Sequence, residues 1–169
     1  MKLMSEKIPD LDALYTRQLR LLLSAEEMIA IKTPRLIETA QDPELIKVLQ
    51  EHLEETRTHA SRLKEILNRA AEKAEPIKCR VVYALFDEAE DMIEDAAHEG
   101  VRQVMLIGES QRIEHYEIAA YGAVRQFARV LGRGEDARLL DQTIREEAAA
   151  DRQLTSIANR INLTAQKAA

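Results

Sequence analysis

Apolar residues recur at helical spacing through most of this sequence, and charged residues interrupt two of the resulting stripes. Glu55 and His59 lie four residues apart on one stripe, and Glu147 and Asp151 lie four residues apart on another. Residues at this spacing share one side of a helix. A charged group on the inward side of a helix bundle is costly unless it is paired or binds a metal ion. The two pairs therefore predict buried polar chemistry inside a helical protein.

The composition favours helices within one globular domain. Hydrophobic residues make up 46% of the chain and charged residues 32%, which is typical of a folded protein. Helix breakers are scarce, with 5 Gly and 4 Pro. A chain of 169 residues can bury a core and fits a single domain. We therefore expect an all-α protein with one helical-bundle domain over residues 1–169.

The charge pattern argues against two classes of partner. The net charge is −6, whereas sequence-independent nucleic-acid binding requires a basic face. No apolar run reaches the length of a membrane span, and no signal-type apolar segment follows the first residues. The single Cys79 cannot form an intramolecular disulfide and is interpreted as a structural thiol. We expect a cytoplasmic protein that binds neither nucleic acid nor membrane.

Apolar spacing and helix breakers predict four long helices and one shorter helix. Their expected bounds are about 10–32, 42–71, 78–98, 101–131 and 135–163. Asp10 and Asp42 are expected to cap the first two helices, and Pro34 to kink or end the first. Gly100 is expected to end the third, and residues 132–134 to separate the last two. The shorter helix lies where ferritin-like bundles have their crossover, so the sequence predicts a ferritin-like four-helix bundle with an additional shorter crossover helix.

The helices can supply the ligands of a dinuclear metal centre. A di-iron or di-manganese site in such a bundle uses one Glu from each of two helices and a Glu with a His from each of the other two. The candidate metal ligands are Glu26, Glu55, His59, Glu114, Glu117, Glu147 and Asp151. Each Glu could instead be a solvated surface residue, and His59 a hydrogen-bonded core histidine. His52 shares a face with Glu55 and could orient a carboxylate, whereas Glu54 and Glu146 are expected to point elsewhere.

Several strings resemble the YciF/YciE-like family of ferritin-like proteins. They are SAE at 24–26, HLEET at 52–56, IEHYEIAAYG at 113–122, LG at 131–132 and EEAAAD at 146–151. The resemblance covers about residues 10–158. It implies a homodimeric bundle, an association with bacterial stress responses and a dinuclear metal centre. The family's ligand positions would fall on Glu26, Glu55, Glu114, Glu117, Glu147 and Asp151.

Glu114 and Glu117 also resemble the third-helix pattern of rubrerythrins, which reduce peroxide. This chain lacks their Cys-rich rubredoxin module and so has no built-in electron donor. The main hypothesis is a stress-associated protein with an iron or manganese centre for oxygen or peroxide chemistry. The alternative is a non-enzymatic structural or interaction protein, in which buried carboxylates pair with His or with an arginine such as Arg57 or Arg125. A third hypothesis, iron storage in a cage, has no sequence feature in its favour.

Overall fold

The computed structural model describes residues 7–70 and 73–168, and its regular elements are five α-helices. They are α1 (Leu11–Thr39), α2 (Pro43–Arg69), α3 (Arg80–Asp95), α4 (Glu99–Val130) and α5 (Gly134–Ala168). The all-α class expected from the composition is confirmed. The predicted end of the second helix near Ala71 falls outside the described residues, and α5 continues past its predicted end near residue 163. No described helix has both the length and the apolar composition of a membrane span.

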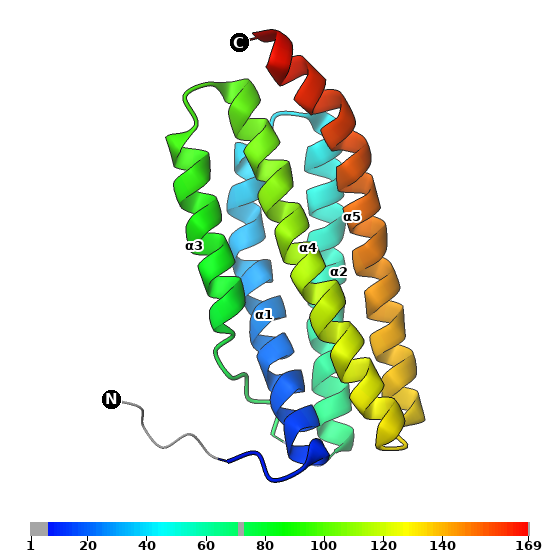
Figure 1. Cartoon of the computed structure of the whole chain (residues 1–169). Helices are drawn as coiled ribbons and strands as arrows, with labels where there is room; N and C mark the ends of the chain where they lie inside the picture. The colour runs from blue at the N-terminus through cyan, green and yellow to red at the C-terminus, as the bar shows by residue number, and fades with distance from the viewer. Residues whose placement is uncertain (1–6, 71–72, 169) are drawn as a thin grey trace, which may run out of the picture.

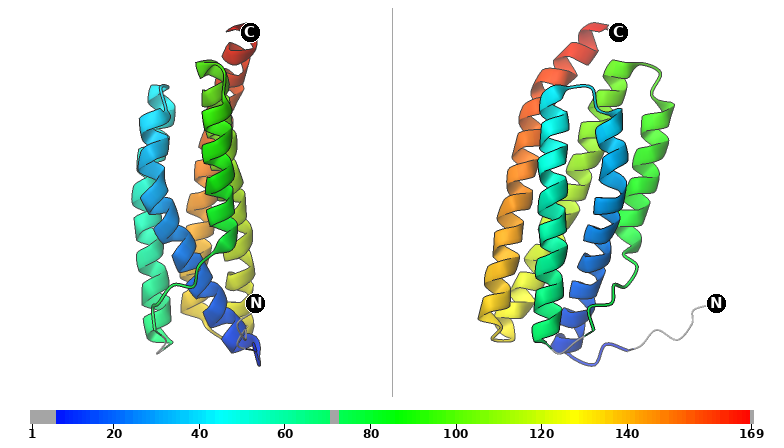
Figure 2. Two further views of the ribbon diagram at one scale, coloured as in Figure 1. Left: turned by 90° about the vertical axis from the view of Figure 1, so that its left-hand side faces the viewer. Right: turned by 180° about the vertical axis from the view of Figure 1, so that it is seen from behind.

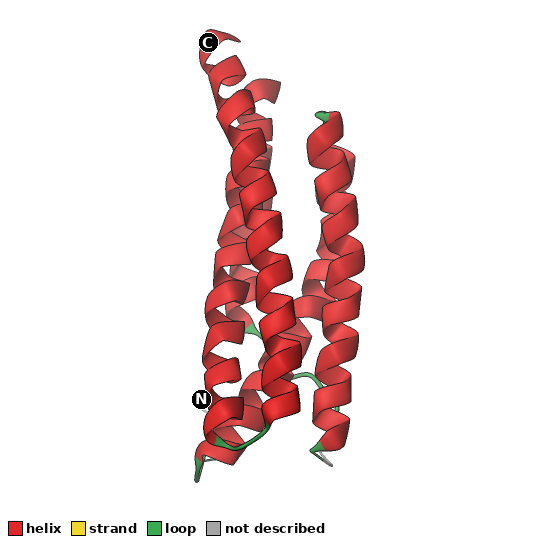
Figure 3. Ribbon diagram, turned by 90° about the vertical axis from the view of Figure 1, so that its right-hand side faces the viewer, coloured by secondary structure: helices red, strands yellow, loops and turns green. Residues whose placement is uncertain are grey.

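The four long helices form two antiparallel hairpins that pack face to face (Figures 1 and 2). α1 packs on α2 and α4 packs on α5, while α1 also contacts α4 and α2 contacts α5. Figure 3 shows the hairpins as two layers. The shorter α3 runs along α1 and α4 and returns the chain to the end at which α2 begins (Figure 1). α2 and α4 therefore run in the same direction, as in a bundle with one long crossover.

Side-chain caps determine where the first two helices begin. The Asp10 carboxylate accepts a hydrogen bond from the Ala13 N–H at 2.8 Å. The Asp42 carboxylate accepts from the N–H groups of Glu44 and Leu45, both at 3.1 Å. These bonds satisfy amides that have no partner within the helix. Both N-caps expected from the sequence are confirmed.

A left-handed glycine closes the turn between α4 and α5. Gly132 has a φ of 70°, a conformation that glycine adopts without steric cost. The Arg133 N–H then donates to the Ala128 carbonyl at 2.8 Å, which satisfies a carbonyl at the end of α4. The Arg133 side chain also pairs with Asp12 at 2.6 Å and ties this turn to the start of α1. The break predicted at residues 132–134 is confirmed.

The first helix does not end where the sequence predicted. It passes through Pro34 and continues to Thr39. A proline inside a helix removes one hydrogen bond and costs about 3 kcal/mol. Leu36 and Ala40, which follow the proline, are buried in the core. Their burial offsets the cost of the proline, so packing overrides the local signal.

The boundary between α3 and α4 also differs from the prediction. α3 ends at Asp95, and Gly100 lies inside α4 instead of ending α3. The backbone of Ala96 is extended, with a ψ of 113°. The Arg102 guanidinium donates to the carbonyls of Ile93 at 3.3 Å and of Ala96 at 3.2 Å. Arg102 thus satisfies carbonyls that are left free where α3 stops, which stabilises the earlier end.

A polar layer divides the core into two apolar clusters. One cluster includes Leu45, Phe86, Leu106 and Ile157, and the other includes Tyr15, Leu63, Tyr121 and Leu140. On each long helix, the residues between the two clusters include buried polar side chains. These are Glu26 on α1, His52, Thr56 and His59 on α2, Glu114 and Glu117 on α4, and Glu147 on α5. The fold therefore brings the predicted polar positions of four helices to one level of the bundle.

We expect Leu106→Ala to lower the free energy of unfolding by about 2–5 kcal/mol, because it leaves a cavity in one apolar cluster. Leu163→Ala is the matched control, since Leu163 is 59% exposed and its truncation leaves no cavity. Urea denaturation followed by circular dichroism measures both. Equal effects of the two substitutions would contradict the packing described here.

Candidate metal centre

Six buried side chains meet in the polar layer and form two overlapping groups. The first group is Glu26, His59 and Glu147, and the second is His52, Glu114, Glu117 and Glu147. Within each group, one potential ligand atom per residue lies within 4.8 Å of every other. Glu147 belongs to both groups, so its carboxylate stands between two adjacent positions that could each hold a cation. We call these six residues the central cluster.

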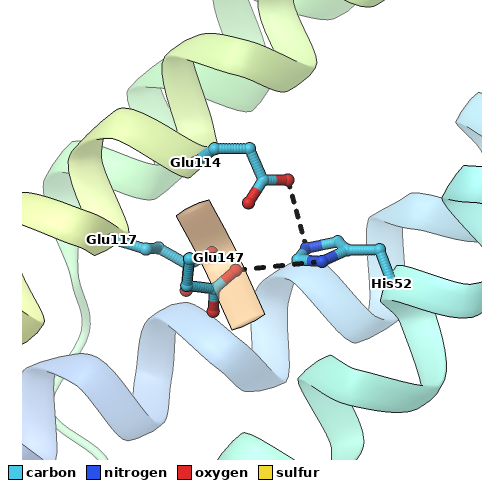
Figure 4. Close-up of side chains that lie close together, drawn as sticks. All are labelled: His52, Glu114, Glu117 and Glu147. Atoms are coloured by element: carbon cyan, nitrogen blue, oxygen red, sulfur yellow. Dashed lines mark ion pairs between the residues drawn. The ribbon is translucent and has the colours of Figure 1, made fainter. Parts of the chain in front are cut away.

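His52 connects two of the helices within the central cluster. Its Nε2 lies 3.2 Å from Oε1 of Glu114 on α4, and its Nδ1 lies 3.8 Å from Oε2 of Glu147 on α5. Figure 4 shows the imidazole facing both carboxylates, with Glu117 on the same side as Glu147. A histidine of α2 thus faces acidic groups from the opposite hairpin.

His59 is held from one side and left open on the other. Its Nε2 lies 2.9 Å from Oε2 of Glu146, whose carboxylate is itself bound by the Arg62 guanidinium. The ionised Glu146 can only accept, so the proton of the imidazole resides on Nε2. Nδ1 then faces Oε1 of Glu147 at 2.8 Å and Oε1 of Glu26 at 3.6 Å. A lone pair directed at two carboxylates is stable only if a proton or a metal ion lies between them.

Unpartnered atoms are concentrated in the central cluster. Each of its residues has at least one buried nitrogen or oxygen atom that makes no hydrogen bond. In Glu117 and in Glu147, neither carboxylate oxygen makes a hydrogen bond. Such atoms are rare in folded proteins, because each costs about 1–3 kcal/mol or more. The donor set also balances in charge, since four carboxylates with two neutral imidazoles match two divalent cations. Carboxylate and imidazole donors suit iron and manganese, so the residues present fit a dinuclear centre.

The pKa values show how strongly the carboxylates perturb one another. Burial raises the pKa of Glu26 to about 8, and it raises the pKa of Glu114 and of Glu117 well above the usual range, with further increases from neighbouring carboxylates. Burial alone would lower the pKa of His59, but the carboxylates of Glu147, Glu26 and Glu146 outweigh it and raise this pKa to about 9. Without a bound cation, the central cluster therefore retains protons near neutral pH.

Five of the predicted ligands belong to the central cluster, and two do not. Glu55 lies at its edge, with a side chain that is 45% exposed and an Oε2 atom 3.9 Å from Nδ1 of His52. Asp151 accepts a hydrogen bond from Gln111 at 3.1 Å and lies 3.4 Å from Nε2 of the exposed His115. The structure therefore places Asp151 near the surface between α4 and α5. The spacing of both pairs was read correctly as one helix side, but each pair has only one member in the cluster.

Two residues lie closer to the centre of the site than the sequence suggested. His52 was expected only to orient a carboxylate, yet it belongs to the central cluster. Glu146 was expected to point away, yet it binds Nε2 of His59 and orients the ring. For His52 a signal existed, because it lies on the same helical face as Glu55. For Glu146 the contact depends on how α5 is rotated against α2, which spacing along one helix does not reveal.

Comparison with known proteins places the chain in a family. The family described as a domain of unknown function (DUF892) matches residues 10–169. The chain belongs to this family. The protein YciF of Escherichia coli (strain K12) is 34% identical to this chain over 148 residues, which covers 86% of the chain and 89% of YciF.

Solved structures support the same relationship for this DUF892 protein. The E. coli stress protein YciF superposes with a TM-score of 0.86 at 30% identity, covering 90% of this chain and 97% of YciF. YcfI from Rhodopseudomonas palustris gives a TM-score of 0.87 at 31% identity, covering 90% and 98% of the two chains. The resemblance stated from the sequence is confirmed, and so is the ferritin-like fold.

The thermal stability of the metal-free DUF892 protein should fall as pH rises from about 6.5 to 9. Glu26, Glu114, Glu117 and His59 have folded-state pKa values above their unfolded ones, so their contribution is lost as pH rises through those values. The lowered pKa values of His52 and Glu147 act in the opposite sense, but only below about pH 6.5.

Differential scanning calorimetry of chelator-treated protein measures this decline, which we expect to be at least about 4 °C in Tm. Glu27→Gln is the control, because Glu27 adjoins Glu26 but pairs with Lys64 outside the cluster. It should leave the decline unchanged. A Tm that is constant or rises across this pH range would contradict the burial of protonated carboxyl groups.

Proposed function

We propose that this chain is a stress-associated ferritin-like protein whose central cluster holds two iron or manganese ions and reduces oxygen or peroxide. The observation that carries the proposal is the set of unpartnered buried carboxylate and imidazole atoms contributed by four helices. Such atoms are energetically costly unless a ligand satisfies them. The association with stress rests on the relationship to YciF, which is described as a stress protein.

The two overlapping groups suggest a role for each side chain. Glu26 and His59 would hold one ion, and His52, Glu114 and Glu117 the other. Glu147 would bridge, because it belongs to both groups. When bound, the redox-active metal supplies electrons to the oxidant and stabilises the charge that develops on oxygen.

Residues around the cluster determine how its ligands are presented. Arg62 fixes Glu146, and Glu146 holds Nε2 of His59, which leaves Nδ1 available to a cation. The Tyr121 hydroxyl donates to Oε1 of Glu26, which leaves Oε2 available. The apolar clusters on either side exclude water and strengthen each electrostatic interaction in the layer. The 169 residues contain one cysteine, Cys79, so in this proposal the electrons come from a donor outside the bundle.

The homodimer and the cytoplasmic location expected from the sequence are part of this proposal. The dimer follows from the resemblance to the YciF/YciE-like family, to which YciF of E. coli belongs, and the location from the single cysteine, which suits a reducing compartment. Size-exclusion chromatography with multi-angle light scattering tests the dimer directly. A monomer at micromolar concentration would contradict it.

One observation favours the alternative of a non-enzymatic structural bundle. A protonated His59 between Glu147 and Glu26 would partly neutralise the cluster without metal. However, the arginines considered for this role are engaged elsewhere. Arg125 pairs with Asp141 at 2.6 Å, and Arg57 pairs with Glu54. The carboxylates therefore lack the guanidinium partners that a structural network would use.

Protein reconstituted anaerobically with Fe²⁺ or Mn²⁺ should retain about two ions per chain after desalting, as expected for a dinuclear site. Glu147→Gln should abolish this retention, because the carboxylate shared by both groups is lost. Glu109→Gln is the matched control. Like Glu147, Glu109 is a buried glutamate, but it lies on α4 and pairs with Arg112 at 3.0 Å outside the cluster. Elemental analysis measures the content, and wild-type protein without near-stoichiometric metal would refute the centre.

Glu117→Gln distinguishes a metal centre from a structural network. Glu117 is fully buried, and neither of its oxygens has a hydrogen-bond partner. Replacing it with a neutral isostere should raise the Tm of the metal-free protein by about 2–4 °C at pH 8 while lowering its metal content. If Glu117 instead belonged to a satisfied structural network, the same substitution would destabilise the metal-free protein.

A further inference from the structure

A surface pocket formed by α5 and by Glu55 of α2 lies beside the central cluster, and none of the six cluster residues lines it. Its volume is about 380 Å³, and its lining includes Glu55 of α2 and Glu146 and Ala149 of α5. Glu55 and Glu146 are partly exposed, whereas the six residues of the central cluster are buried. Two carboxylates of the pocket lining therefore stand between solvent and the buried polar layer, one on α2 and one on α5.

Two carboxylates of the pocket lining lie next to the histidines of the central cluster. On one side, Glu146 contacts Nε2 of His59 at 2.9 Å. On the other side, Oε2 of Glu55 lies 3.9 Å from Nδ1 of His52. His52 is buried, with only 6% of its surface exposed, and its Nδ1 atom has no hydrogen-bond partner. Each of the two overlapping groups thus has one histidine directly behind a carboxylate of the pocket.

Among the acidic groups of the pocket, Glu55 is the one without an arginine or lysine partner in the described part of the chain (residues 7–70 and 73–168). Asp141 pairs with Arg125 at 2.6 Å and with Arg145 at 2.7 Å. Glu146 is bound by Arg62. Among the residues that the structure describes, Glu55 has one ion-pair contact, with buried His52, and its side chain is 45% exposed. The Glu55 carboxylate therefore borders both solvent and the buried His52.

We propose that divalent cations enter the central cluster through this pocket and that Glu55 is the carboxylate that transfers them from solvent to the His52 side. The inference rests on the proposed metal centre. Arg138 and Arg145 also line the pocket, but Arg145 pairs with Asp141 and Arg138 with Glu135. The partly exposed carboxylate of Glu55 can therefore attract cations and raise their local concentration, which increases the rate of entry. Glu55 is thereby a positioning residue for uptake and not a permanent ligand, in agreement with its position outside both groups of potential ligand atoms.

The two roles predict different kinetics. A transit residue lowers the barrier for entry and for exit by the same amount, so its loss slows both rates and leaves Kd unchanged. A ligand stabilises the bound state, so its loss accelerates release and weakens binding. Glu55→Gln should therefore slow both association and release about tenfold, within the range by which electrostatic focusing alters rates. It should also reduce the dependence of the association rate on ionic strength.

Stopped-flow mixing of the metal-free full-length chain with Co²⁺ measures association through its visible absorbance, and mixing of the loaded protein with EDTA measures release. Glu54→Gln is the matched control, because it removes the same charge at an adjacent position that is 68% exposed and paired with Arg57. It should change neither rate by more than about twofold, as expected for a surface charge outside the pocket.

Ala149→Leu tests the same route without changing any charge. Ala149 lines the pocket and is not part of the central cluster, so a larger side chain narrows the passage and leaves the donor atoms intact. We expect both rates to fall together, again with the wild-type Kd.

The outcomes separate the entry route from the metal centre. An unchanged rate in either Glu55→Gln or Ala149→Leu overturns the route, although Co²⁺ binding to the wild type still supports the centre. Faster release with a weaker Kd in Glu55→Gln overturns the transit role and makes Glu55 a ligand. Failure of the wild type to bind Co²⁺ at all refutes the proposed centre itself.

Discussion

The desolvation of four carboxylates at one level of the bundle is the constraint on which the rest of the structure depends. An ion removed from water costs several kcal/mol even after the protein relaxes, and like charges at close range add to this cost. Glu26, Glu114 and Glu117 respond with raised pKa values, while Glu147 stays ionised beside His59 and His52. The layer is therefore a high-energy region of the molecule unless positive charge enters it.

The apolar clusters on either side make this cost tolerable. Both contain fully buried leucines and an aromatic side chain, such as Phe86 in one and Tyr15 in the other. Burial of each such side chain contributes about 1.5–3 kcal/mol, so the stability of the fold originates away from the polar layer. Contacts such as Arg62 with Glu146 then hold the layer in a defined geometry. The bundle can thus keep strained polar groups in its centre without losing its fold.

Sequence patterns predicted the elements of the fold well, because their signals are local. The caps at Asp10 and Asp42 and the glycine turn at Gly132 each act within a few residues. The helix end expected near Pro34 does not occur, because the packing of the following turn against distant residues outweighs the missing hydrogen bond. The local signals are reliable where no tertiary contact competes with them.

The candidate site was predicted less completely, for a related reason. Helical spacing identifies a side of a helix, but that side is wide enough to hold both His52 and Glu55. Which of them points to the centre depends on the rotation of α2 within the bundle. Asp151 follows Glu147 by one turn, but contacts with Gln111 keep it near the surface. The spacing of residues therefore predicted the height of the site along each helix. Which side chains point into the site depends on how the helices pack.

The crossover helix gives the bundle two unlike sides. The long helices contact one another in the order α1, α2, α5, α4 and back to α1, and α3 packs outside the edge formed by α1 and α4. At that edge α3 forms a second layer outside α1 and α4. At the opposite edge, between α2 and α5, none of the described helices forms a second layer. A chain that joined α2 to α4 by a loop without a helix would keep the same central side chains, but both edges would then consist of a single layer of helices. The connectivity of the fold thereby covers one of these two edges with a further helix and leaves the opposite edge, among the described helices, to α2 and α5 alone.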